Sequence, residues 1–435
     1  MRQLQKLQDQ IGETVEIEGW VHTVRSQKRM RFLVIRIDGG KIQCVVDNQT
    51  QPELGETVSR LTRESIVRIS GVIVENKQVG LGGLEIQIQT IEHLSLADPA
   101  LPIDITSPTQ SGIEPRMDWK FLDLRRPESR LIFEIQTEVE WAMRQYWKQN
   151  RFIEIHTPKL MATASESGAE LFEVGYFGKK AYLAQSPQFY KQMAMAAGFD
   201  RVFEIAPVFR ANPSFTSRHD TEFTSVDVEL SWIESHENVM QFEECWLSHV
   251  LAHVANVFGA HISESFGVEV IVPSVPFPRI PLAEALRIIE ERGHRNEREG
   301  DLDPAGERLL CEAVLSEQGH EFAFVTDYPC SVRPFYHMRY EEGERLTKSF
   351  DLLWKGLEVT TGAQREHRYD VLEKQAREKG LYTEHIQFYL NFFRYGCPPH
   401  GGFGFGLTRM LTVLLGLPAV REATFLVRTP NRLTP

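Results

Sequence analysis

Residues 203–232 contain a basic and aromatic set with the spacing of a phosphate-binding hairpin. Apolar residues run to Phe209, polar turn-forming residues interrupt them after Arg210, and alternation resumes from Phe223. This pattern predicts two antiparallel strands joined by a loop, with Arg210 at the end of the first strand. An arginine fork binds phosphate oxygens bidentately, and an aromatic ring stacks on a nucleobase. The segment therefore favours a nucleoside triphosphate site, although an ordinary surface hairpin gives the same pattern.

The same hairpin offers further charged groups. Its loop carries Arg218 and His219, and its second strand carries Asp227 and Glu229. A basic loop beside a fixed arginine strengthens the case for a phosphate ligand.

A pair of carboxylates lies farther along the chain. Ser349–Leu353 and Gly356–Thr361 have the composition of two strands and carry Asp351 and Glu358. Carboxylates of this kind can hold Mg²⁺ between phosphate oxygens. A solvated or ion-paired acidic pair is the alternative interpretation.

A glycine run near the end of the chain leads into an amphipathic helix. Residues 401–406 read GGFGFG, and Leu407, Met410, Leu411 and Leu414 follow with helical spacing. Arg409 lies off that apolar stripe in the first turn, where a helix N-terminus already favours phosphate. The spacing of the glycines is not that of a dinucleotide fingerprint. The run indicates a phosphate site only in combination with the other segments.

The composition is that of an ordinary globular protein. Hydrophobic residues make up 42% and charged residues 25% of the 435 residues, and no apolar run has membrane-spanning length. The five cysteines are scattered and never form a C-x-x-C pair, which argues against structural zinc and fits a reducing compartment. We therefore expect a cytoplasmic protein of two or three domains without membrane association. The net charge of −12 leaves nucleic-acid binding open, because a local basic face suffices.

Residues 1–96 have the strand order of an OB-fold barrel, with a helix-like segment at 52–60 between the third and fourth strands. The expected strands are Val15–Arg25, Phe32–Asp38, Lys41–Asp47, Ile66–Glu75 and Leu84–Leu94. An OB-fold commonly binds oligonucleotides on its sheet face. Arg25 and Phe32 lie among further basic residues on the first two strands, a combination suited to single-stranded RNA. The alternative is a generic barrel with Phe32 in its core.

The rest of the chain predicts a linker and one large domain. Four prolines within 97–118 indicate the linker. Residues 119–435 then predict an α+β domain built on an antiparallel sheet flanked by helices. A helix is expected at Pro127–Asn150 and a strand at Phe152–His156.

The large domain has three further features. The loop Thr163–Gly168 is rich in small residues and could fold over a ligand. A helix is expected to begin at Lys191. A helical insertion is expected at 281–318, and no catalytic part is expected for its charge-rich run at 290–303.

Three separated segments resemble the signature motifs of the class II aminoacyl-tRNA synthetases. They are the helix and strand ending at Pro158, the hairpin with Arg210, and the glycine-rich strand and helix with Arg409. An N-terminal OB-fold narrows the resemblance to the aspartate, asparagine and lysine group. The stretches SPQFYKQ, FDLLWKGLEVTTGAQREH, YGCPPHGGFGFG and RLTP resemble aspartyl-tRNA synthetases, and the compact length resembles their archaeal type. The likeness covers nearly the whole chain.

The resemblance implies a two-step reaction. The α-carboxylate of L-aspartate attacks the α-phosphate of ATP, giving aspartyl-adenylate and pyrophosphate, and the 3′-terminal ribose hydroxyl of tRNA-Asp then takes the aspartyl group. Because the carboxylate is already ionised at neutral pH, positioning and charge neutralisation at phosphorus carry most of the catalysis. The resemblance also implies Mg²⁺ and a homodimer with the motif around Pro158 at the subunit interface.

The same resemblance assigns roles to individual residues. Arg210 and Arg409 are the expected catalytic residues, at the α-phosphate and at the distal phosphates or adenine. The expected ATP-binding set is Arg210, Asn212, Arg218, His219, Asp220, Phe223, Glu358, Gly406, Leu407, Thr408 and Arg409. The expected aspartate-binding set is Glu166, Gln188, Lys191, Arg210, Asp227, Thr361 and Arg365. The expected metal ligands are Asp351, Glu358 and Thr361.

Two positions bear on the choice of aspartate. Lys191 and Arg365 match the family positions that grip the side-chain carboxylate, and an asparagine amide would leave such buried cations unpaired. An asparaginyl enzyme is expected to lack Lys191 and to carry Glu at Asp227. The chain departs from the family at Asn212, where a Glu is usual, and we expect activity to survive. The alternatives are an asparaginyl-tRNA synthetase, a synthetase-derived asparagine synthetase, which normally lacks the OB domain, and a non-catalytic tRNA-binding paralogue.

By resemblance, four residues of the OB-fold bear on the anticodon. Phe32 stacks a base, Arg25 and Gln43 read the first two bases, and His22 bears on the third. Strict enzymes tend to carry Trp at this last position and Lys in the loop between the fourth and fifth strands, whereas relaxed enzymes tend to carry His and Pro. The chain has His22, but its loop at 77–83 has no Pro. We predict that it aspartylates tRNA-Asp and tRNA-Asn, with the misacylated product passing to an amidotransferase; a strictly discriminating enzyme is the alternative.

Overall fold

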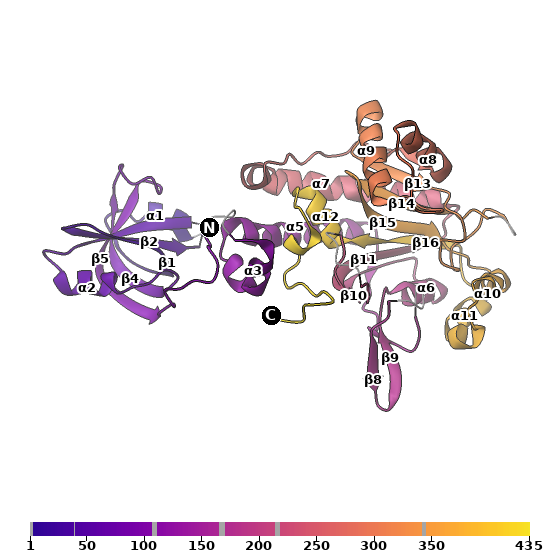
Figure 1. Cartoon of the computed structure of the whole chain (residues 1–435), viewed down its shortest axis with the longest axis horizontal. Helices are drawn as coiled ribbons and strands as arrows, with labels where there is room; N and C mark the ends of the chain where they lie inside the picture. The colour runs from indigo at the N-terminus through magenta and orange to yellow at the C-terminus, as the bar shows by residue number, and fades with distance from the viewer. Residues whose placement is uncertain (1–2, 39, 107–110, 165–169, 214–217, 342–344) are drawn as a thin grey trace. The chain divides into compact units, whose positions relative to one another are not determined.

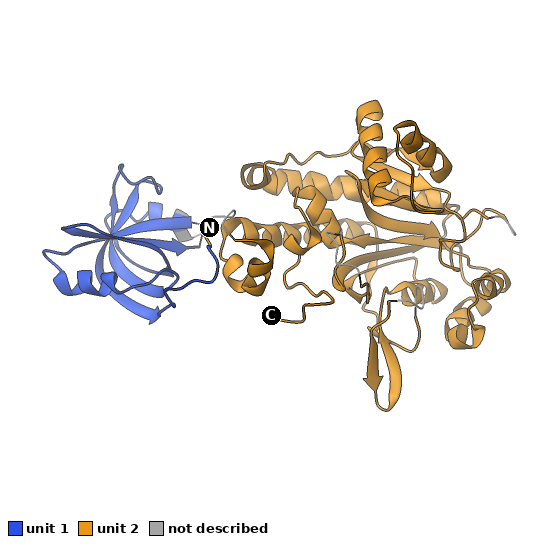
Figure 2. Cartoon of the chain, viewed as in Figure 1, with its two compact units in different colours: residues 1–104 blue, residues 105–435 orange. Residues whose placement is uncertain are grey.

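The computed structural model of the protein describes residues 3–38, 40–106, 111–164, 170–213, 218–341 and 345–435. The chain divides into two compact units, Met1–Asp104 and Ile105–Pro435 (Figure 2). None of the helices in these ranges is both long and apolar enough to cross a membrane.

The first unit is a closed five-stranded barrel with the strand order β1-β2-β3-β5-β4 (Figure 1). Its elements are α1 (Gln3–Gln8), β1 (Thr14–Ser26), β2 (Met30–Ile37), β3 (Gly40–Asp47), α2 (Pro52–Ser59), β4 (Ile66–Glu75) and β5 (Leu84–Ser95). Apolar residues alternate along each strand and meet inside the barrel; in β4 these are Val67, Ile69 and Ile73. The predicted OB-fold is confirmed. Phe32 does not belong to the buried core cluster, which takes Leu33 instead, so the alternative of a core Phe32 is wrong.

The expected linker at 97–118 is partly structured. Residues 113–118 form α3 (Ile113–Asp118), followed by α4 (Lys120–Asp123), and both lie in the second unit. The fully buried carboxylate of Asp123 anchors this region by accepting hydrogen bonds from Arg116 at 2.9 Å and Lys120 at 3.3 Å. Proline content therefore marked the unit boundary but concealed the two short helices.

The second unit is built on an eight-stranded sheet with the order β12-β13-β14-β15-β16-β11-β10-β6. The strands are β6 (Ile153–Glu154), β10 (Arg201–Phe209), β11 (Glu222–Ser231), β12 (Arg279–Pro281), β13 (Phe322–Thr326), β14 (Ser349–Trp354), β15 (Leu357–Gln364) and β16 (His400–Gly406). Neighbours are antiparallel except for β12 with β13 and β10 with β6. A small sheet of β7 (Leu160–Met161), β9 (Lys179–Leu183) and β8 (Glu173–Tyr176) lies beside it. The expected α+β architecture is confirmed.

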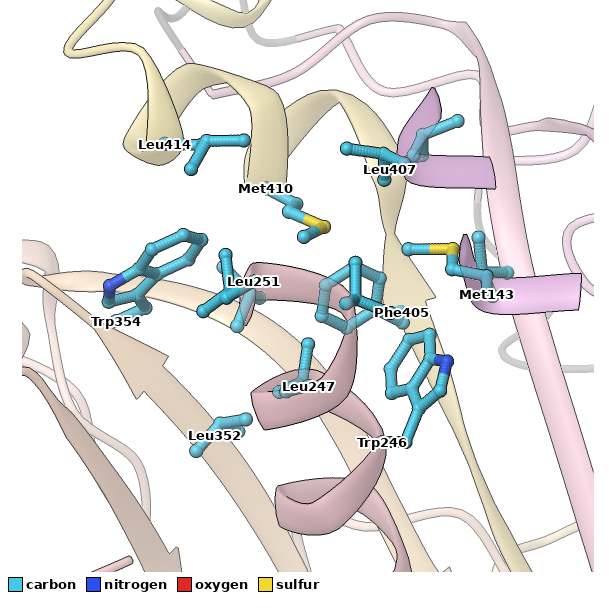
Figure 3. Close-up of a cluster of buried hydrophobic side chains, with 14 of the residues drawn as sticks. Met143, Trp246, Leu247, Leu251, Leu352, Trp354, Phe405, Leu407, Met410 and Leu414 are labelled. Carbon is cyan, nitrogen blue, oxygen red and sulfur yellow. The ribbon is translucent and has the colours of Figure 1, made fainter. Parts of the chain in front are cut away.

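Three helices form one core with the sheet: α5 (Pro127–Gln149), α7 (His236–Phe266) and α12 (Leu407–Leu414). Figure 3 shows Met410 and Leu414 of α12 and Leu247 and Leu251 of α7 converging on aromatic side chains of the sheet such as Phe405. Helix α7 ends at a left-handed glycine, Gly267, with φ +68°. The core thus fixes the strand face that lies opposite the cavity described below.

Further helices complete the second unit around the sheet. They are α6 (Gln188–Ala196), α8 (Leu282–Glu291), α9 (Pro304–Gln318), α10 (Tyr369–Glu378) and α11 (Gln387–Arg394), with 3₁₀ turns at Thr383–Ile386 and Val420–Glu422. Helix α6 begins at Gln188 rather than at Lys191 as expected, because the hydroxyl of Ser186 accepts from the Gln188 N–H at 3.3 Å and starts the helix earlier. Helices α8 and α9 make up the predicted insertion and share a separate apolar cluster with β13.

A buried carboxyl under the sheet gives the fold a pH dependence. Glu243 of α7 is fully buried, and its Oε1 accepts from the Thr360 hydroxyl at 2.6 Å. Burial, with Glu244 and Asp351 nearby, raises the pKa of Glu243 to about 8 although the Thr360 bond opposes it. Between pH 4.5 and 8 the unfolded chain loses this proton and the folded chain keeps it, so stability falls as pH rises through this window.

Replacement of Glu243 by Gln should remove that loss. We expect E243Q to be more stable than the wild type at pH 8 by about 2 kcal/mol or more, and to differ much less at pH 5. Urea-induced unfolding followed by tryptophan fluorescence at both pH values measures the difference. E264Q, at an exposed position of the same helix, is the matched control, and equal pH slopes for the wild type and E243Q would contradict the assignment.

Candidate active site

Most of the residues predicted for the site line one cavity of about 320 Å³. The wall is formed by α6, the β10–β11 hairpin, β15, β16 and the start of α12, together with the segment that connects β13 to β14. The predicted residues that line it are Gln188, Lys191, Arg210, Asn212, Arg218, His219, Asp220, Phe223, Asp227, Glu358, Thr361, Arg365, Gly406, Thr408 and Arg409. Segments more than 200 residues apart in the sequence are therefore brought to one place, as the motifs predict.

Two predicted residues are placed differently. Leu407 is buried in the core below the cavity, and Asp351 lies behind the wall with 4% of its surface exposed. Glu166 lies outside the described residues.

The hairpin presents a cation and an aromatic ring together. Val208 pairs with Phe223 across the hairpin, and the Arg210 N–H donates to the Thr221 carbonyl at 2.9 Å, which continues the ladder by one residue. The Arg210 guanidinium lies 5.5 Å from the centre of the Phe223 ring. A cation beside an aromatic face can hold a phosphate next to a stacked base.

The glycine-rich strand β16 presents no side chains on its cavity-facing side between residues 402 and 406. Phe403 and Phe405 point into the core, and the alternating glycines face the other way, where Gly404 and Gly406 line the cavity. At Gly402 a Cβ atom would overlap the backbone of β11 at Val228 and Glu229. The glycines therefore allow β16 to lie close to β11 and keep this part of the cavity wall free of side chains.

Arg409 and Glu358 form an ion pair on the cavity wall. The Arg409 Nη1 donates to the Glu358 carbonyl at 2.9 Å and to its Oε1 at 3.2 Å, and the Thr361 hydroxyl donates to the same Oε1 at 3.3 Å. Burial raises the pKa of Glu358, but Arg409, Arg333 and Arg210 outweigh it and hold the pKa below its usual value. Glu358 is therefore ionised at neutral pH.

Asp351 is held by a residue that the sequence analysis did not single out. Arg333, on the β13–β14 connection, donates to the Asp351 Oδ2 at 2.6 Å and stacks on the Tyr328 ring at 3.6 Å. The other oxygen, Oδ1, is buried and has no hydrogen-bond partner among the described residues. Asp351 pairs across the sheet with Thr361, so the three predicted metal ligands come from neighbouring positions of β14 and β15.

This donor set fits Mg²⁺. Mg²⁺ is usually bound by one or two carboxylates that leave several positions for water and substrate phosphates. Glu358 is ionised and lies on the cavity wall, and the Asp351 Oδ1 lacks a donor. No larger cluster of metal-binding side chains is found in the part of the chain that the structure describes.

A charge-balanced cluster of two cations and two carboxylates lies under the glycine strand. Lys191 donates to the Asp227 Oδ1 at 3.0 Å and lies 3.4 Å from the Glu229 Oε2. Arg365 donates through Nε to the Glu229 Oε1 at 3.0 Å and through Nη2 to the Gly402 carbonyl at 2.9 Å. All four side chains are at most 5% exposed. Burial raises the pKa of Glu229, but Arg365 and Lys191 hold it below its usual value.

His337 completes the cationic end of the cavity as a neutral ring. Arg365 Nη1 lies 3.0 Å from His337 Nε2, and an arginine can only donate. Burial lowers the pKa of His337 well below its usual value, and Arg365 lowers it further. The neutral ring therefore accepts from Arg365 at Nε2 and carries its proton on Nδ1.

A chain of buried hydrogen bonds orients Gln188. Its Nε2 donates to the Gln192 Oε1 at 2.8 Å, and the Tyr389 hydroxyl donates to the same oxygen at 2.9 Å. The Gln192 Nε2 then donates to His400 Nε2 at 3.0 Å, and His400 Nδ1 donates to the Pro398 carbonyl at 2.8 Å. Burial lowers the pKa of His400 to about 4, so the ring stays neutral and the direction of the chain is fixed.

In the barrel, the predicted anticodon residues share one face. Arg25 pairs with Phe32 across β1 and β2, and Val34 pairs with Gln43 across β2 and β3, so Arg25, Phe32 and Gln43 project to the same side. All three side chains are at least partly exposed. Gln43 donates to the Glu85 Oε2 at 2.6 Å.

His22 lies at a bulge of β1, with its Nε2 3.0 Å from the Lys41 ammonium. Burial lowers the pKa of His22, and Lys41 and Arg36 lower it further. The ring is neutral, accepts from Lys41 and carries its proton on Nδ1.

Comparison with known families identifies both units. The model of tRNA synthetases class II (D, K and N) matches residues 112–430, and the model of the OB-fold nucleic acid binding domain matches residues 15–94. The chain belongs to the class II aminoacyl-tRNA synthetases.

Similar proteins span the synthetase almost end to end. An aspartate–tRNA(Asp/Asn) ligase from Methanopyrus kandleri is 44% identical, over 98% of this chain and 96% of its own length. An aspartate–tRNA(Asp) ligase from Thermococcus kodakarensis is 41% identical, over 98% and 97% of the two chains. The crystal structure of asparaginyl-tRNA synthetase from Pyrococcus horikoshii with asparaginyl-adenylate superposes with a TM-score of 0.90 at 31% identity, covering 98% and 97%. Family membership also implies ATP as a substrate of the synthetase.

Sequence reasoning gave no role to three residues that shape the site of the synthetase. Glu229 was expected on the hairpin, but its burial between two cations depends on α6 and β15. Arg333 and His337 lie in a segment without helical or strand periodicity, and the sequence RPFYH was its only signal.

Loss of the Glu229 charge should destabilise the synthetase. In E229Q the buried Arg365 and Lys191 keep their charges with only Asp227 left to balance them, and we expect a loss of roughly 3 kcal/mol of unfolding free energy. Urea-induced unfolding at pH 7.5 measures it. E222Q, at an exposed position of the same strand, should differ from the wild type by less than about 0.5 kcal/mol. Wild-type stability in E229Q would show that the cluster does not depend on this carboxylate.

Proposed function

We propose that the synthetase attaches L-aspartate to tRNA through aspartyl-adenylate. The observation that carries this proposal is the buried cluster of Lys191, Arg365, Asp227 and Glu229 at the end of the cavity. Aspartate can replace the Lys191–Asp227 pair by two new pairs, its side-chain carboxylate with Lys191 and its ammonium with Asp227. The neutral amide of asparagine would leave the positive charge of Lys191 uncompensated.

The arrangement of the cavity supports the activation step. Arg210 would contact the α-phosphate, Phe223 would stack the adenine, and Arg409, Arg218 and His219 would face the remaining phosphates. Asn212 and Asp220 line the same wall, as do Gly406 and Thr408. Gln188 and Thr361 would line the aspartate end, with Glu166 as a further candidate. Because the attacking carboxylate is already ionised, these residues act by orientation and by neutralising charge at phosphorus.

Mg²⁺ would be held by Asp351, Glu358 and Thr361. Bound there, it would neutralise phosphate charge during the transfer. The protein's part is to keep Glu358 ionised through Arg409 and to hold Asp351 in place through Arg333.

A homodimer is the proposed assembly. Large apolar side chains are exposed on the elements of the first motif: Trp141 of α5, Ile153 of β6 and Leu160 after Pro158. Trp141 is 58% exposed, which is unusual for so large an apolar residue. Contact with a second copy would cover these residues.

The barrel is proposed to bind the anticodon of tRNA-Asp and tRNA-Asn. Arg25, Phe32 and Gln43 form the common reading face, and His22 would face the base that differs between the two. Beside the neutral His22 ring, Lys41 offers an ammonium donor, and the O2 carbonyl that could accept from it is common to both pyrimidines. The relatives are divided, since the one from Methanopyrus kandleri is named for tRNA(Asp/Asn) and that from Thermococcus kodakarensis for tRNA(Asp). The aspartyl-tRNA-Asn formed in the cytoplasm would pass to an amidotransferase.

Charging assays test the proposed function. Purified tRNA-Asp and tRNA-Asn are incubated with the synthetase, ATP and labelled aspartate or, separately, labelled asparagine. We expect both tRNAs to accept aspartate and neither to accept asparagine. Charging of tRNA-Asn more than about a thousandfold less efficiently, on the order of 4 kcal/mol, would establish a strictly discriminating enzyme. Charging with asparagine alone would refute the aspartate assignment.

Lys191→Met should weaken aspartate selectively. The variant removes the cation proposed to pair with the side-chain carboxylate, so KM for aspartate in ATP–pyrophosphate exchange should rise and discrimination against asparagine should fall at least tenfold, about 1.4 kcal/mol. Lys180→Met, at an exposed position of β9, is the control. An unchanged ratio of kcat/KM for the two amino acids would place the carboxylate site elsewhere.

A further inference from the structure

The helical insertion reaches the wall of the ATP side of the cavity through Glu307. This residue lies in the first turn of α9 and is 5% exposed. Its Oε2 accepts from Arg218 Nη1 at 2.6 Å and from the Glu358 N–H at 3.4 Å. One carboxylate of the insertion thus contacts two residues of the predicted ATP site.

The turn between β14 and β15, against which α9 packs, holds Arg218 from a second side. Arg218 Nη2 donates to the Gly356 carbonyl at 3.1 Å. Gly356 forms the turn between β14 and β15, with φ +84°, and a Cβ atom there would overlap Arg308 of α9. Helix α9 therefore packs against the turn that joins the strands of Asp351 and Glu358.

The start of α9 is fixed by the charge-rich run for which no catalytic part was expected. The Asp303 side chain caps the helix by accepting from the N–H groups of Ala305 at 3.0 Å and Gly306 at 2.8 Å, and His294 Nε2 lies 2.9 Å from the same carboxylate. A buried cluster that includes Ile289, Leu310 and Val325 holds the insertion against the sheet. The position of Glu307 relative to the cavity is thereby set by packing and capping.

We propose that Glu307 is a positioning residue that holds Arg218 at the cavity wall for ATP binding. The insertion thereby supports the side of the site that receives the distal phosphates. The inference rests on the proposed role of Arg218 as an ATP ligand. An arginine has five N–H donors, so its contacts with Glu307 and Gly356 are compatible with a phosphate contact. Ordering the long side chain before ATP arrives removes that entropy loss from the binding step.

Binding of ATP to variants of the full chain tests the proposal. The dissociation constant of ATP with Mg²⁺ is measured by isothermal titration calorimetry, and KM for ATP, KM for aspartate and kcat are measured by aspartate-dependent ATP–pyrophosphate exchange. In E307A we expect the Kd and KM for ATP to rise about tenfold, about 1.4 kcal/mol. The kcat and the KM for aspartate should stay within twofold of the wild type.

Two further variants separate positioning from a loss of structure. E307Q retains an acceptor for Arg218 and should recover most of the ATP affinity that E307A loses. E312A, at an exposed position of the same helix, should behave as the wild type. The double variant R218A/E307A should bind ATP no more weakly than R218A, because Glu307 acts through Arg218.

The outcomes distinguish this inference from the proposed function. Wild-type ATP affinity in E307A, an equal rise in KM for aspartate, or a further loss in the R218A background would overturn the role of Glu307. Tighter ATP binding by E307A would also overturn it, since Glu307 would then compete with phosphate for Arg218. If the wild type binds ATP without aspartate-dependent exchange, the aspartate assignment fails while the calorimetric comparison of E307A still decides the inference.

Discussion

The site depends on the ionic cluster of Lys191, Arg365, Asp227 and Glu229. Each carboxylate comes from β11, whereas Lys191 comes from α6 and Arg365 follows directly after β15, so the cluster forms only when helix and sheet are in register. Isolated buried charges are costly, whereas paired and hydrogen-bonded ones are tolerated. The cluster therefore couples correct assembly of the sheet to formation of the amino-acid end of the cavity.

Alternation along each strand allows one sheet to contribute both to the hydrophobic core and to the site. On β16 the phenylalanines enter the core with α7 and α12, and the glycines between them face the cavity. On β11, Val226, Val228 and Leu230 enter the core, while Asp227 and Glu229 meet the cations on the opposite side. The period of two along a strand is enough to separate the two tasks.

This periodicity is also why the hairpin, the barrel and the glycine strand could be predicted from the sequence. The alternation that defines them is local. The resemblance to the family motifs assigned Arg210, Glu358 and Arg409 to one site, and all three line the cavity. The burial of Glu229 could not be predicted in this way. A charged residue at an alternating position is expected to face solvent unless its partners are known, and these are Lys191 of α6 and Arg365 directly after β15. The contacts of Glu307 likewise depend on where the insertion packs, and the short helices before Pro127 were concealed by proline content.

The glycine face of β16 has a consequence for how this scaffold can change its substrate. That part of the wall is main chain, and its shape is set by the ladders to β11 and β15. At Gly402 even a methyl group would meet the backbone of the neighbouring strand. At the cavity-lining glycines, a Cβ atom at Gly404 would lie 3.4 Å from the Asp227 carboxylate and one at Gly406 would lie 3.3 Å from the Arg409 side chain. A side chain there would crowd residues proposed to bind substrate. Amino-acid preference is therefore expected to change through the side chains that surround this wall, on α6, β11, β15 and the segment of Arg333 and His337. Enzymes that prefer different amino acids can therefore share one backbone. The close superposition of an asparaginyl-tRNA synthetase on this chain is consistent with this.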